Sequence, residues 1–170
     1  MLSKVVVFSG ISAIVIGLTG CFGYQLGTSL PPNITSVYVR PFDNRSGEPD
    51  VETAVTSATV REFQKDGSLR MANAEEADVI VEASVTRVTL EPLRYSKDRA
   101  TETTEFRLLI TANVALKDRK TGKVLSTHPG LTGKNTFVPA GDLSSAKRLA
   151  IPTAAQDLAH RVVAAVVEAW

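Results

Sequence analysis

The sequence is poor in the residues that perform catalysis or bind metals. Among 170 residues there are one cysteine, Cys21, and two histidines, His128 and His160. A single cysteine forms no disulfide within the chain, and with these two histidines it makes no metal site of the usual ligand spacing. The sequence also lacks the GxSxG, P-loop and GxGxxG motifs. We therefore expect no enzyme activity, no metal and no cofactor.

The sequence also lacks an excess of charge of either sign. The chain has 19 basic and 18 acidic residues, with a formal net charge of +1. A net charge near zero gives no support for general nucleic-acid binding. After residue 21 no apolar run approaches the length of a membrane-spanning helix. Nothing in the remaining sequence repeats, so we expect one domain.

Residues 1–20 have the pattern of a signal peptide. Lys4 forms a short basic start, and residues 5–18 are a mostly apolar run of 14 residues. The run ends in Leu18-Thr19-Gly20-Cys21, which resembles a lipobox. In a lipobox, small residues let the peptidase hold the scissile backbone, and the cysteine thiolate takes up the diacylglyceryl group. An ordinary signal peptide followed by a chance cysteine is the alternative.

This pattern predicts a mature chain of residues 21–170 that is anchored to a membrane by lipid on Cys21. Residues 21–33 would be a short tether, since Gly23 and Gly27 and the pair Pro31-Pro32 oppose regular structure. Phe22 follows the cysteine, whereas Asp at this position retains lipoproteins of enterobacteria in the inner membrane. The resemblance therefore favours the outer membrane.

Residues 34–170 read as a single domain that starts with a strand and a helix. Residues 34–42 are rich in Val, Ile and Tyr and predict a strand, and residues 44–47 predict a turn. We expect Ser46 or Gly47 to cap a helix with Pro49 at its first position. Asp66-Gly67 would end this helix.

Three further strands follow. Residues 78–90 alternate between apolar and polar side chains, but the phase slips near Arg87, which predicts a bulge there. Residues 104–117 alternate without interruption and form the clearest strand of the chain. Residues 124–138 predict a strand that Pro129-Gly130 interrupts. The acidic run Glu75-Glu76-x-Asp78 is read as a solvated turn rather than a cation site.

The chain closes with a helix whose apolar stripe runs from Ile151 to Trp170. Its start is open: it begins at Asp142 or Ser144 and is kinked at Pro152, or it begins at Ile151 or Pro152. The predicted order is β-α-β-β-β-α. Because each helix has one apolar stripe, we expect an α+β fold in which two helices pack on one face of a four-stranded mixed sheet. The other face of the sheet would be polar.

Several segments resemble the LptE family of lipopolysaccharide-assembly lipoproteins. The mature start Cys21-x-Gly23-Tyr24-x-Leu26 is similar to the family's start, with Phe22 as an insertion. The pattern Ile34-x-x-Val37-x-Val39-x-x-Phe42-x-Asn44 and the strand beginning Thr104-Glu105-Phe106 also resemble family patterns. Asp118-x-x-Thr121-Gly122 and a last helix ending near Trp170 fit as well. The resemblance covers residues 18–170.

The resemblance implies a partner and a ligand. LptE-like proteins occupy the lumen of LptD, an outer-membrane β-barrel, assist its assembly, and take part in delivering lipopolysaccharide to the cell surface. Family members also bind lipopolysaccharide through basic residues. The corresponding positions here are Lys97 and Arg99 near a hairpin tip and Lys147 and Arg148 in the loop before the last helix. The alternative is that these four are solvated loop charges.

Two other functions remain open from the sequence. One is a different periplasm-facing envelope lipoprotein, such as a secretion-pore subunit or a scaffold. The other is a lipid-anchored hydrolase that uses carboxylates such as Asp43, Glu48 and Asp50, although these residues are better explained as helix-start capping groups.

Overall fold

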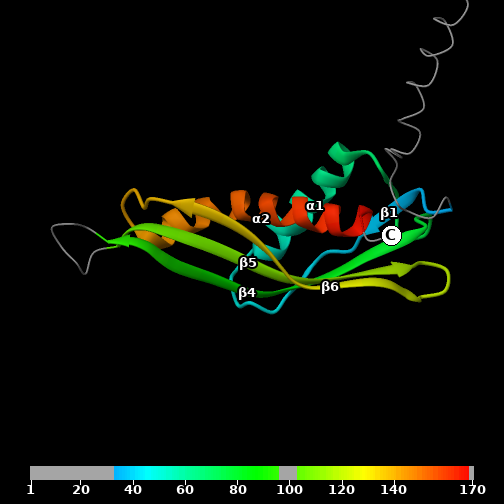
Figure 1. The fold of residues 1–170 in the computed structure, drawn as a ribbon, viewed down its shortest axis with the longest axis horizontal. Helices are drawn as coiled ribbons and strands as arrows, with labels where there is room; N and C mark the ends of the chain where they lie inside the picture. The colour runs from blue at the N-terminus through cyan, green and yellow to red at the C-terminus, as the bar shows by residue number, and fades with distance from the viewer. Residues whose placement is uncertain (1–32, 96–102, 169–170) are drawn as a thin grey trace, which may run out of the picture.

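The computed structural model describes residues 33–95 and 103–168, and it shows a long sheet with two helices on one side (Figure 1). Cys21, the predicted signal peptide and all but the last residue of the predicted tether lie outside the described residues. The elements in chain order are β1 (Ser36–Val39), β2 (Asp43–Asn44), α1 (Val51–Asp66), β3 (Arg70–Met71), β4 (Val79–Tyr95), β5 (Thr103–Asp118), β6 (Val124–Phe137) and α2 (Leu143–Val167).

The sheet is mixed, as predicted, but it has six strands instead of four. Its order is β3-β1-β4-β5-β6, and β2 pairs with β4 beside β1. The three short strands run parallel to their neighbours, whereas β4, β5 and β6 form an antiparallel meander. The prediction of an α+β fold with two helices on one face is therefore confirmed, and the number of strands is corrected.

The predicted first strand is interrupted because the chain leaves the sheet after Arg40. The Arg40 N–H still donates to the Val81 carbonyl at 3.0 Å. Pro41 has no N–H, and the Phe42 N–H donates to the Thr56 hydroxyl at 3.0 Å instead of to a strand. The chain then returns to β4 as β2. The other unpredicted strand, β3, has only two residues, which is too short for an alternating pattern.

Both predicted irregularities of the long strands are present as bulges. The pairing of β4 with β5 shifts between Val85 and Arg87, where the apolar pattern changes phase. In β6, Pro129-Gly130 lies in a second register shift without ending the strand. There Gly130 has a φ of 71°, and its N–H donates to the Asn113 side-chain oxygen at 2.9 Å. Each bulge keeps the apolar residues that follow on the helix side.

The structure corrects the predicted start of α1 and confirms its end. The residue before the helix is Asp50, which has a left-handed φ of 61° and makes no capping hydrogen bond with its side chain. Pro49 therefore precedes the helix, and Ser46 accepts a hydrogen bond from the Glu48 N–H at 3.2 Å. At the other end, Gly67 has a φ of 75° and donates to the Phe63 carbonyl.

The structure also shows which of the predicted starts of α2 is correct. Asp142 accepts hydrogen bonds from the N–H groups of Ser144 at 2.9 Å and Ser145 at 3.0 Å, which is the pattern of a helix N-cap. The helix begins at Leu143 and continues through Pro152 to Val167. Its buried stripe includes Ala154, Leu158 and Val162, which pack on β5 and β6.

Helix α2 lies directly against the backbone of β6 at Gly133. A Cβ atom at this position would collide with the Ala154 carbonyl oxygen and the Leu158 backbone nitrogen. We predict that Gly133→Ala lowers the free energy of unfolding by about 2 kcal/mol, because neither helix atom can move independently. Gly122→Ala, which meets no atom within 4 Å but has a φ of 69°, should cost about 1 kcal/mol. Urea titrations that gave both variants the same stability would contradict this close packing.

Asp78 joins the start of β1 to the start of β4. Its Oδ2 accepts hydrogen bonds from the N–H and hydroxyl groups of Thr35 and Ser36, at distances of 2.8–3.0 Å. These bonds, led by the Thr35 N–H, lower the pKa of Asp78 from 3.8 to about 2. A carboxylate with a lowered pKa stabilises the fold above its unfolded-state pKa and loses that contribution as the pH falls.

We therefore predict a loss of stability between about pH 4 and about pH 2 that depends on Asp78. Asp78→Asn should be less stable than the unchanged protein at pH 7, by about 1 kcal/mol, and the two should converge as the pH approaches 2. Thermal unfolding followed across this range tests the prediction. If the two proteins differed in stability by the same amount at every pH, ionisation of Asp78 would not contribute to the pH dependence.

Candidate functional site

The predicted ligand-binding residues fall into two groups. Lys97 and Arg99 lie outside the described residues. Lys147 and Arg148 are in the second turn of α2, and not in the loop before it as predicted, because the Asp142 cap starts the helix earlier. Figure 1 shows that α2 starts at the end of the molecule where β4 ends and β5 begins. The fold thus brings Lys147 and Arg148 to the same end as Tyr95 and Thr103, the described residues on either side of the segment 96–102.

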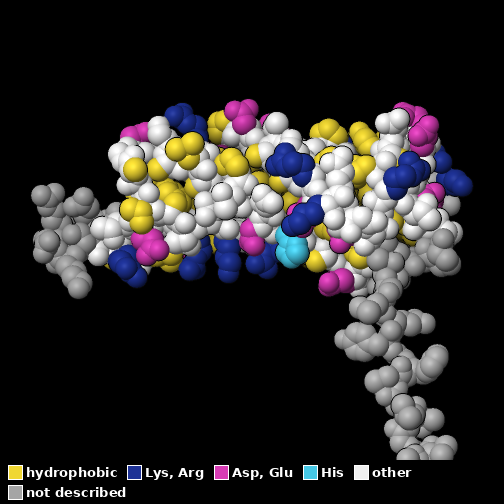
Figure 2. Space-filling view, turned by 90° about the horizontal axis from the view of Figure 1, so that it is seen from above, with side chains coloured by type: hydrophobic (Ala, Val, Ile, Leu, Met, Phe, Trp, Pro, Cys, Tyr) yellow, Lys and Arg dark blue, Asp and Glu magenta, His cyan; other side chains and the backbone are white. Residues whose placement is uncertain are grey.

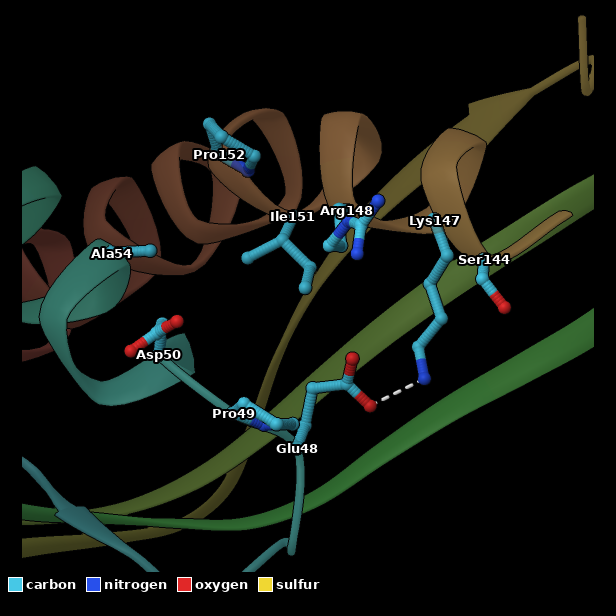
Figure 3. A pocket seen from close by; sticks show the side chains of 9 residues that line it. All are labelled: Glu48, Pro49, Asp50, Ala54, Ser144, Lys147, Arg148, Ile151 and Pro152. Atoms are coloured by element: carbon cyan, nitrogen blue, oxygen red, sulfur yellow. Dashed lines mark hydrogen bonds and ion pairs between the residues drawn. The ribbon is translucent and has the colours of Figure 1, made fainter. Parts of the chain in front are cut away.

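Lys147 and Arg148 line a groove of about 460 Å³ between α2 and the segment that leads into α1 (Figure 3). Its apolar wall consists of prolines and aliphatic side chains from both helices, and its polar wall carries two acids and two bases. The lining residues are Glu48, Pro49, Asp50, Ala54, Ser144, Lys147, Arg148, Ile151 and Pro152.

Lys147 forms an ion pair with Glu48 across this groove. The Lys147 side chain is 29% exposed and the Glu48 side chain is 16% exposed, so both charges are partly shielded from water. Shielding strengthens the attraction between them, and it makes the loss of either partner costly for the other. Lys147 is therefore not the freely solvated loop cation of the alternative interpretation.

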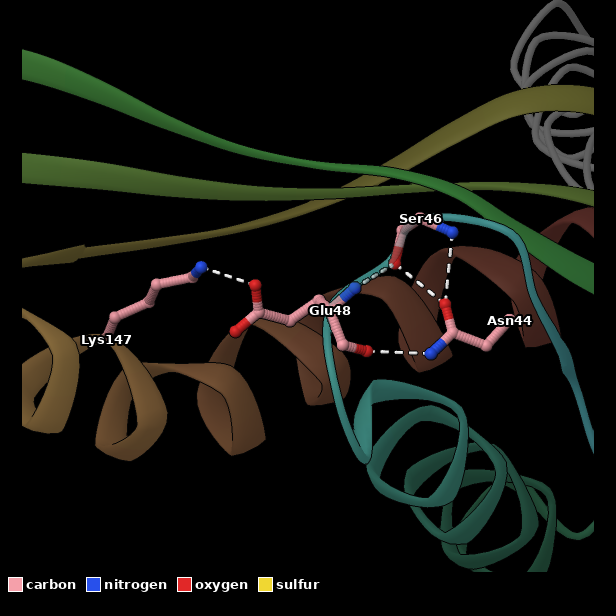
Figure 4. A network of polar contacts seen from close by, with 4 residues as sticks. All are labelled: Asn44, Ser46, Glu48 and Lys147. Atoms are coloured by element: carbon pink, nitrogen blue, oxygen red, sulfur yellow. Dashed lines mark hydrogen bonds and ion pairs between the residues drawn. The ribbon is translucent and has the colours of Figure 1, made fainter.

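A hydrogen-bonded turn holds Glu48 in position (Figure 4). The Asn44 side-chain oxygen accepts from the N–H of Ser46 at 3.0 Å and from its hydroxyl at 2.8 Å. The Asn44 amide donates to the Glu48 carbonyl at 2.7 Å and to the Glu52 carboxylate at 2.7 Å. This network explains why the predicted capping residue Ser46 stabilises the turn before the helix instead of the helix itself.

Arg148 is the more available cation of the groove. Its side chain is exposed and donates to the Ser145 hydroxyl at 3.0 Å. No salt bridge of Arg148 is found within residues 33–95 and 103–168. Asp50, on the opposite wall, is the one non-glycine described residue with a positive φ. Because Arg148 is exposed and has no salt bridge among the described residues, the groove can receive an anionic group at Arg148, beside the apolar side chains of the lining.

The carboxylates considered for catalysis are engaged elsewhere or exposed. Asp43 pairs with Arg45 at 3.5 Å, and Glu48 pairs with Lys147. In the described part of the chain, no group of three or more His, Cys, Asp or Glu residues is arranged to hold a metal ion. None of the helices described is long and apolar enough to cross a membrane.

The two histidines lie apart from each other. His160 of α2 contacts the buried Glu62 of α1, with 3.2 Å between Nδ1 and Oε1. His128 of β6 lies 3.1 Å from the Ser126 hydroxyl. The Glu62 contact therefore links the two helices.

Solved structures with this fold include three that align with most of the chain. They are protein XCC0632 from Xanthomonas campestris (14% identity, TM-score 0.54, 82% of this chain and 87% of that chain), a protein from Caulobacter crescentus CB15 described as a lipoprotein (15%, 0.53, 79% and 89%), and the hypothetical protein CT253 from Chlamydia trachomatis (13%, 0.52, 78% and 95%). At these identities the likeness establishes the fold alone. No curated protein sequence matches the chain.

The α+β fold with one covered sheet face therefore places the chain in a structural class that recurs among bacterial proteins. The family model of LptE, described as lipopolysaccharide-assembly, matches residues 34–166. This match extends from the residues before β1 almost to the end of α2. The chain belongs to the LptE family, which confirms the resemblance found in the sequence.

The Glu48–Lys147 pair could not be predicted from the sequence, because its members are 99 positions apart. We predict that Lys147→Met lowers the free energy of unfolding by about 1 kcal/mol, because it leaves the shielded Glu48 carboxylate without its partner. Arg148→Met, which removes the same charge from the next position, should change stability by less than about 0.5 kcal/mol. The double variant Glu48→Gln/Lys147→Met should recover part of the loss. Equal stability of the two single variants would indicate that the ion pair is not formed.

Proposed function

We propose that this protein is an outer-membrane lipoprotein that plugs an LptD-like β-barrel, assists assembly of the barrel and takes part in delivering lipopolysaccharide to the cell surface. The observation that carries the proposal is the LptE match over residues 34–166, which contain every described strand, all of α1 and all but the last residue of α2. The role is one of binding and assembly, and we propose no catalysis.

The polar face of the sheet supports a position inside a barrel. The helices cover one face, whereas the other carries residues such as Ser84, Thr111, Asn113 and Lys117. The interiors of large outer-membrane barrels are polar and contain water. A narrow domain with one polar sheet face and nearly balanced charge suits such a lumen better than an apolar environment.

The N-terminal sequence supports the anchor. Cleavage before Cys21 would leave a tether of residues 21–33 between the lipid and the domain. Each buried methylene of an acyl chain contributes about 0.8 kcal/mol to membrane binding. Several chains on Cys21 would therefore keep the domain beside the membrane that contains the barrel, and Phe22 would favour the outer membrane.

Lipopolysaccharide would be met at the end of the molecule where α2 starts. Lys97, Arg99, Lys147 and Arg148 would contact its phosphates, Arg by paired hydrogen bonds and Lys as a point charge. Arg148 is exposed and needs no rearrangement, whereas Lys147 would have to exchange the Glu48 carboxylate for a phosphate. We therefore expect Arg148 to contribute more than Lys147.

Affinity purification of the full chain from its native envelope tests the proposal. We predict that a large outer-membrane β-barrel and lipopolysaccharide co-purify with the protein, and that depletion of the protein leaves this barrel misassembled. Cys21→Ala is the matched control, because it removes the anchor without changing the domain. It should lose the lipid-dependent mass increase and leave the outer-membrane fraction.

Other results would exclude the proposed role. Recovery of secretion-pore or scaffold subunits in place of a barrel would favour the alternative envelope function. A free monomer without a barrel, together with normal barrel assembly after depletion, would contradict the plug and assembly roles.

A further inference from the structure

The uncovered face of the sheet carries basic side chains in the half where β4 ends and β5 begins. On β5, the alternation places Arg107, Leu109 and Thr111 on the face opposite the helices, because Leu108 and Ile110 are buried beneath α2. The register puts Arg87 beside Thr111, and Lys134 beside Leu109. Arg87, Arg107 and Lys134 thus share one surface, which we call the distal basic set.

The distal basic set differs from the other cations of this face because none of its members forms a salt bridge within the described residues, and Glu91, which lies opposite Arg107 in the register, does not pair with it. Towards the opposite end, Arg40 and Lys117 both bind Glu82 at 2.5 Å. Beyond the set, Arg94 pairs with Glu105 at 3.6 Å. Among residues 33–95 and 103–168, none of the three cations of the set has a salt bridge, and the Nε of Arg107 is buried without a hydrogen-bond partner. A buried donor without an acceptor is rare and costs free energy.

The spacing allows the three cations to meet one ligand. Neighbouring strands are about 4.8 Å apart, and residues on one face repeat about every 6.8 Å along a strand. Lys134 is therefore roughly 8 Å from Arg107 at the backbone, and Arg87, four positions along β5 and one strand across, is roughly 14 Å from Arg107. The long side chains of the set can span these distances to a ligand that carries more than one phosphate. Figure 2 shows a row of Lys and Arg side chains that projects from one long side of this half of the molecule.

Hydroxyl groups accompany the charges. Thr136 lies beside Arg107 in the register, and the hydroxyls of Thr111 and Thr132 are 3.3 Å apart between Arg87 and Lys134. Guanidinium groups bind phosphate by paired hydrogen bonds, and threonine hydroxyls both donate to and accept from sugar hydroxyls. Protein carboxylates would satisfy the cations but would leave the hydroxyls unused.

We infer that the distal basic set is a binding site for phosphate groups carried on a sugar, on the sheet face opposite the groove of Lys147 and Arg148. The identification of this ligand with the phosphorylated sugars of lipopolysaccharide rests on the proposed function. The Arg107 side chain would turn so that its Nε, which is buried without a partner, gains a phosphate oxygen, and Arg87 and Lys134 would contact the ligand from either side. The domain would then have two anion sites, one on each side of the sheet.

The test compares two triple variants of the mature chain in detergent. Arg87→Gln/Arg107→Gln/Lys134→Gln removes the set. Arg70→Gln/Lys120→Gln/Lys123→Gln removes the same charge from exposed positions at the other end of the domain, where β1 and β4 begin. The probes are purified lipopolysaccharide, the same material after enzymatic dephosphorylation, and inorganic pyrophosphate. Circular dichroism establishes that each variant is folded, and if the first triple variant is not, Arg87→Gln/Lys134→Gln replaces it because both side chains are exposed.

We expect removal of the set to weaken lipopolysaccharide binding about tenfold or more at roughly 0.1 M salt, and less at higher salt. The control variant should stay within about twofold. Dephosphorylated material should bind the unchanged protein and the first variant equally, and pyrophosphate should compete with intact lipopolysaccharide only when the set is present.

Two results would overturn the inference and leave the proposed function standing. One is equal lipopolysaccharide binding by the two triple variants. The other is unchanged lipopolysaccharide binding with loss of the barrel on purification, which would assign the set to acidic residues of the barrel wall. Pyrophosphate binding that depends on the set, without any lipopolysaccharide binding, would support the phosphate site and contradict the proposed ligand.

Discussion

The alternation of side chains along β5 is the constraint on which the rest of the structure depends. β5 pairs with both β4 and β6, so its two faces decide which side of the whole meander is apolar. Leu108, Ile110 and Leu116 are fully buried on one side. A shift of one residue in pairing would move all of them to water, so the register is strongly specified. The bulges in β4 and β6 preserve this separation where their own sequences break the pattern.

The covered face then determines how closely α2 can approach. Gly133 lets the helix backbone lie on β6, and Asp157 of α2 accepts the outward N–H of Lys134 at 2.9 Å. This hydrogen bond satisfies one backbone donor at the edge of the sheet, where unpaired groups invite association with other strands. The same contact therefore packs the core and protects part of the edge.

Local signals in the sequence were sufficient for the long elements. The phase change at Arg87 and the Asp66-Gly67 helix end depend on neighbouring residues, and both are present in the structure. Contacts distant in sequence could not be predicted in this way. The two-residue β3 is too short for a period, and the departure of Phe42 from the sheet depends on the Thr56 hydroxyl of a helix.

The candidate site likewise has features that the sequence predicts and features that depend on contacts distant in sequence. The basic character of Lys147 and Arg148 is visible in the sequence, but the difference between them is not. Glu48 holds one of them, through a turn built on Asn44, and leaves the other exposed. Similarly, the alternation of residues 104–117 is enough to place Arg107 on the polar face. Its lack of a salt bridge could not be predicted, because it depends on which side chains of β4 and β6 lie beside it. Residue type indicated which chemistry is available, and only the fold shows which charges are already neutralised.

This distinction also changes what the near-zero net charge means. Balanced charge argued against a general polyanion-binding surface, and that argument concerns the field of the whole molecule at a distance. At contact distance the relevant quantity is the local pairing of each cation. Arg40 and Lys117 are neutralised by ion pairs with Glu82. On the same face, the distal basic set forms no salt bridge among the described residues. A domain with this arrangement can enter a crowded polar lumen without strong repulsion or attraction, and still bind an anion at chosen positions.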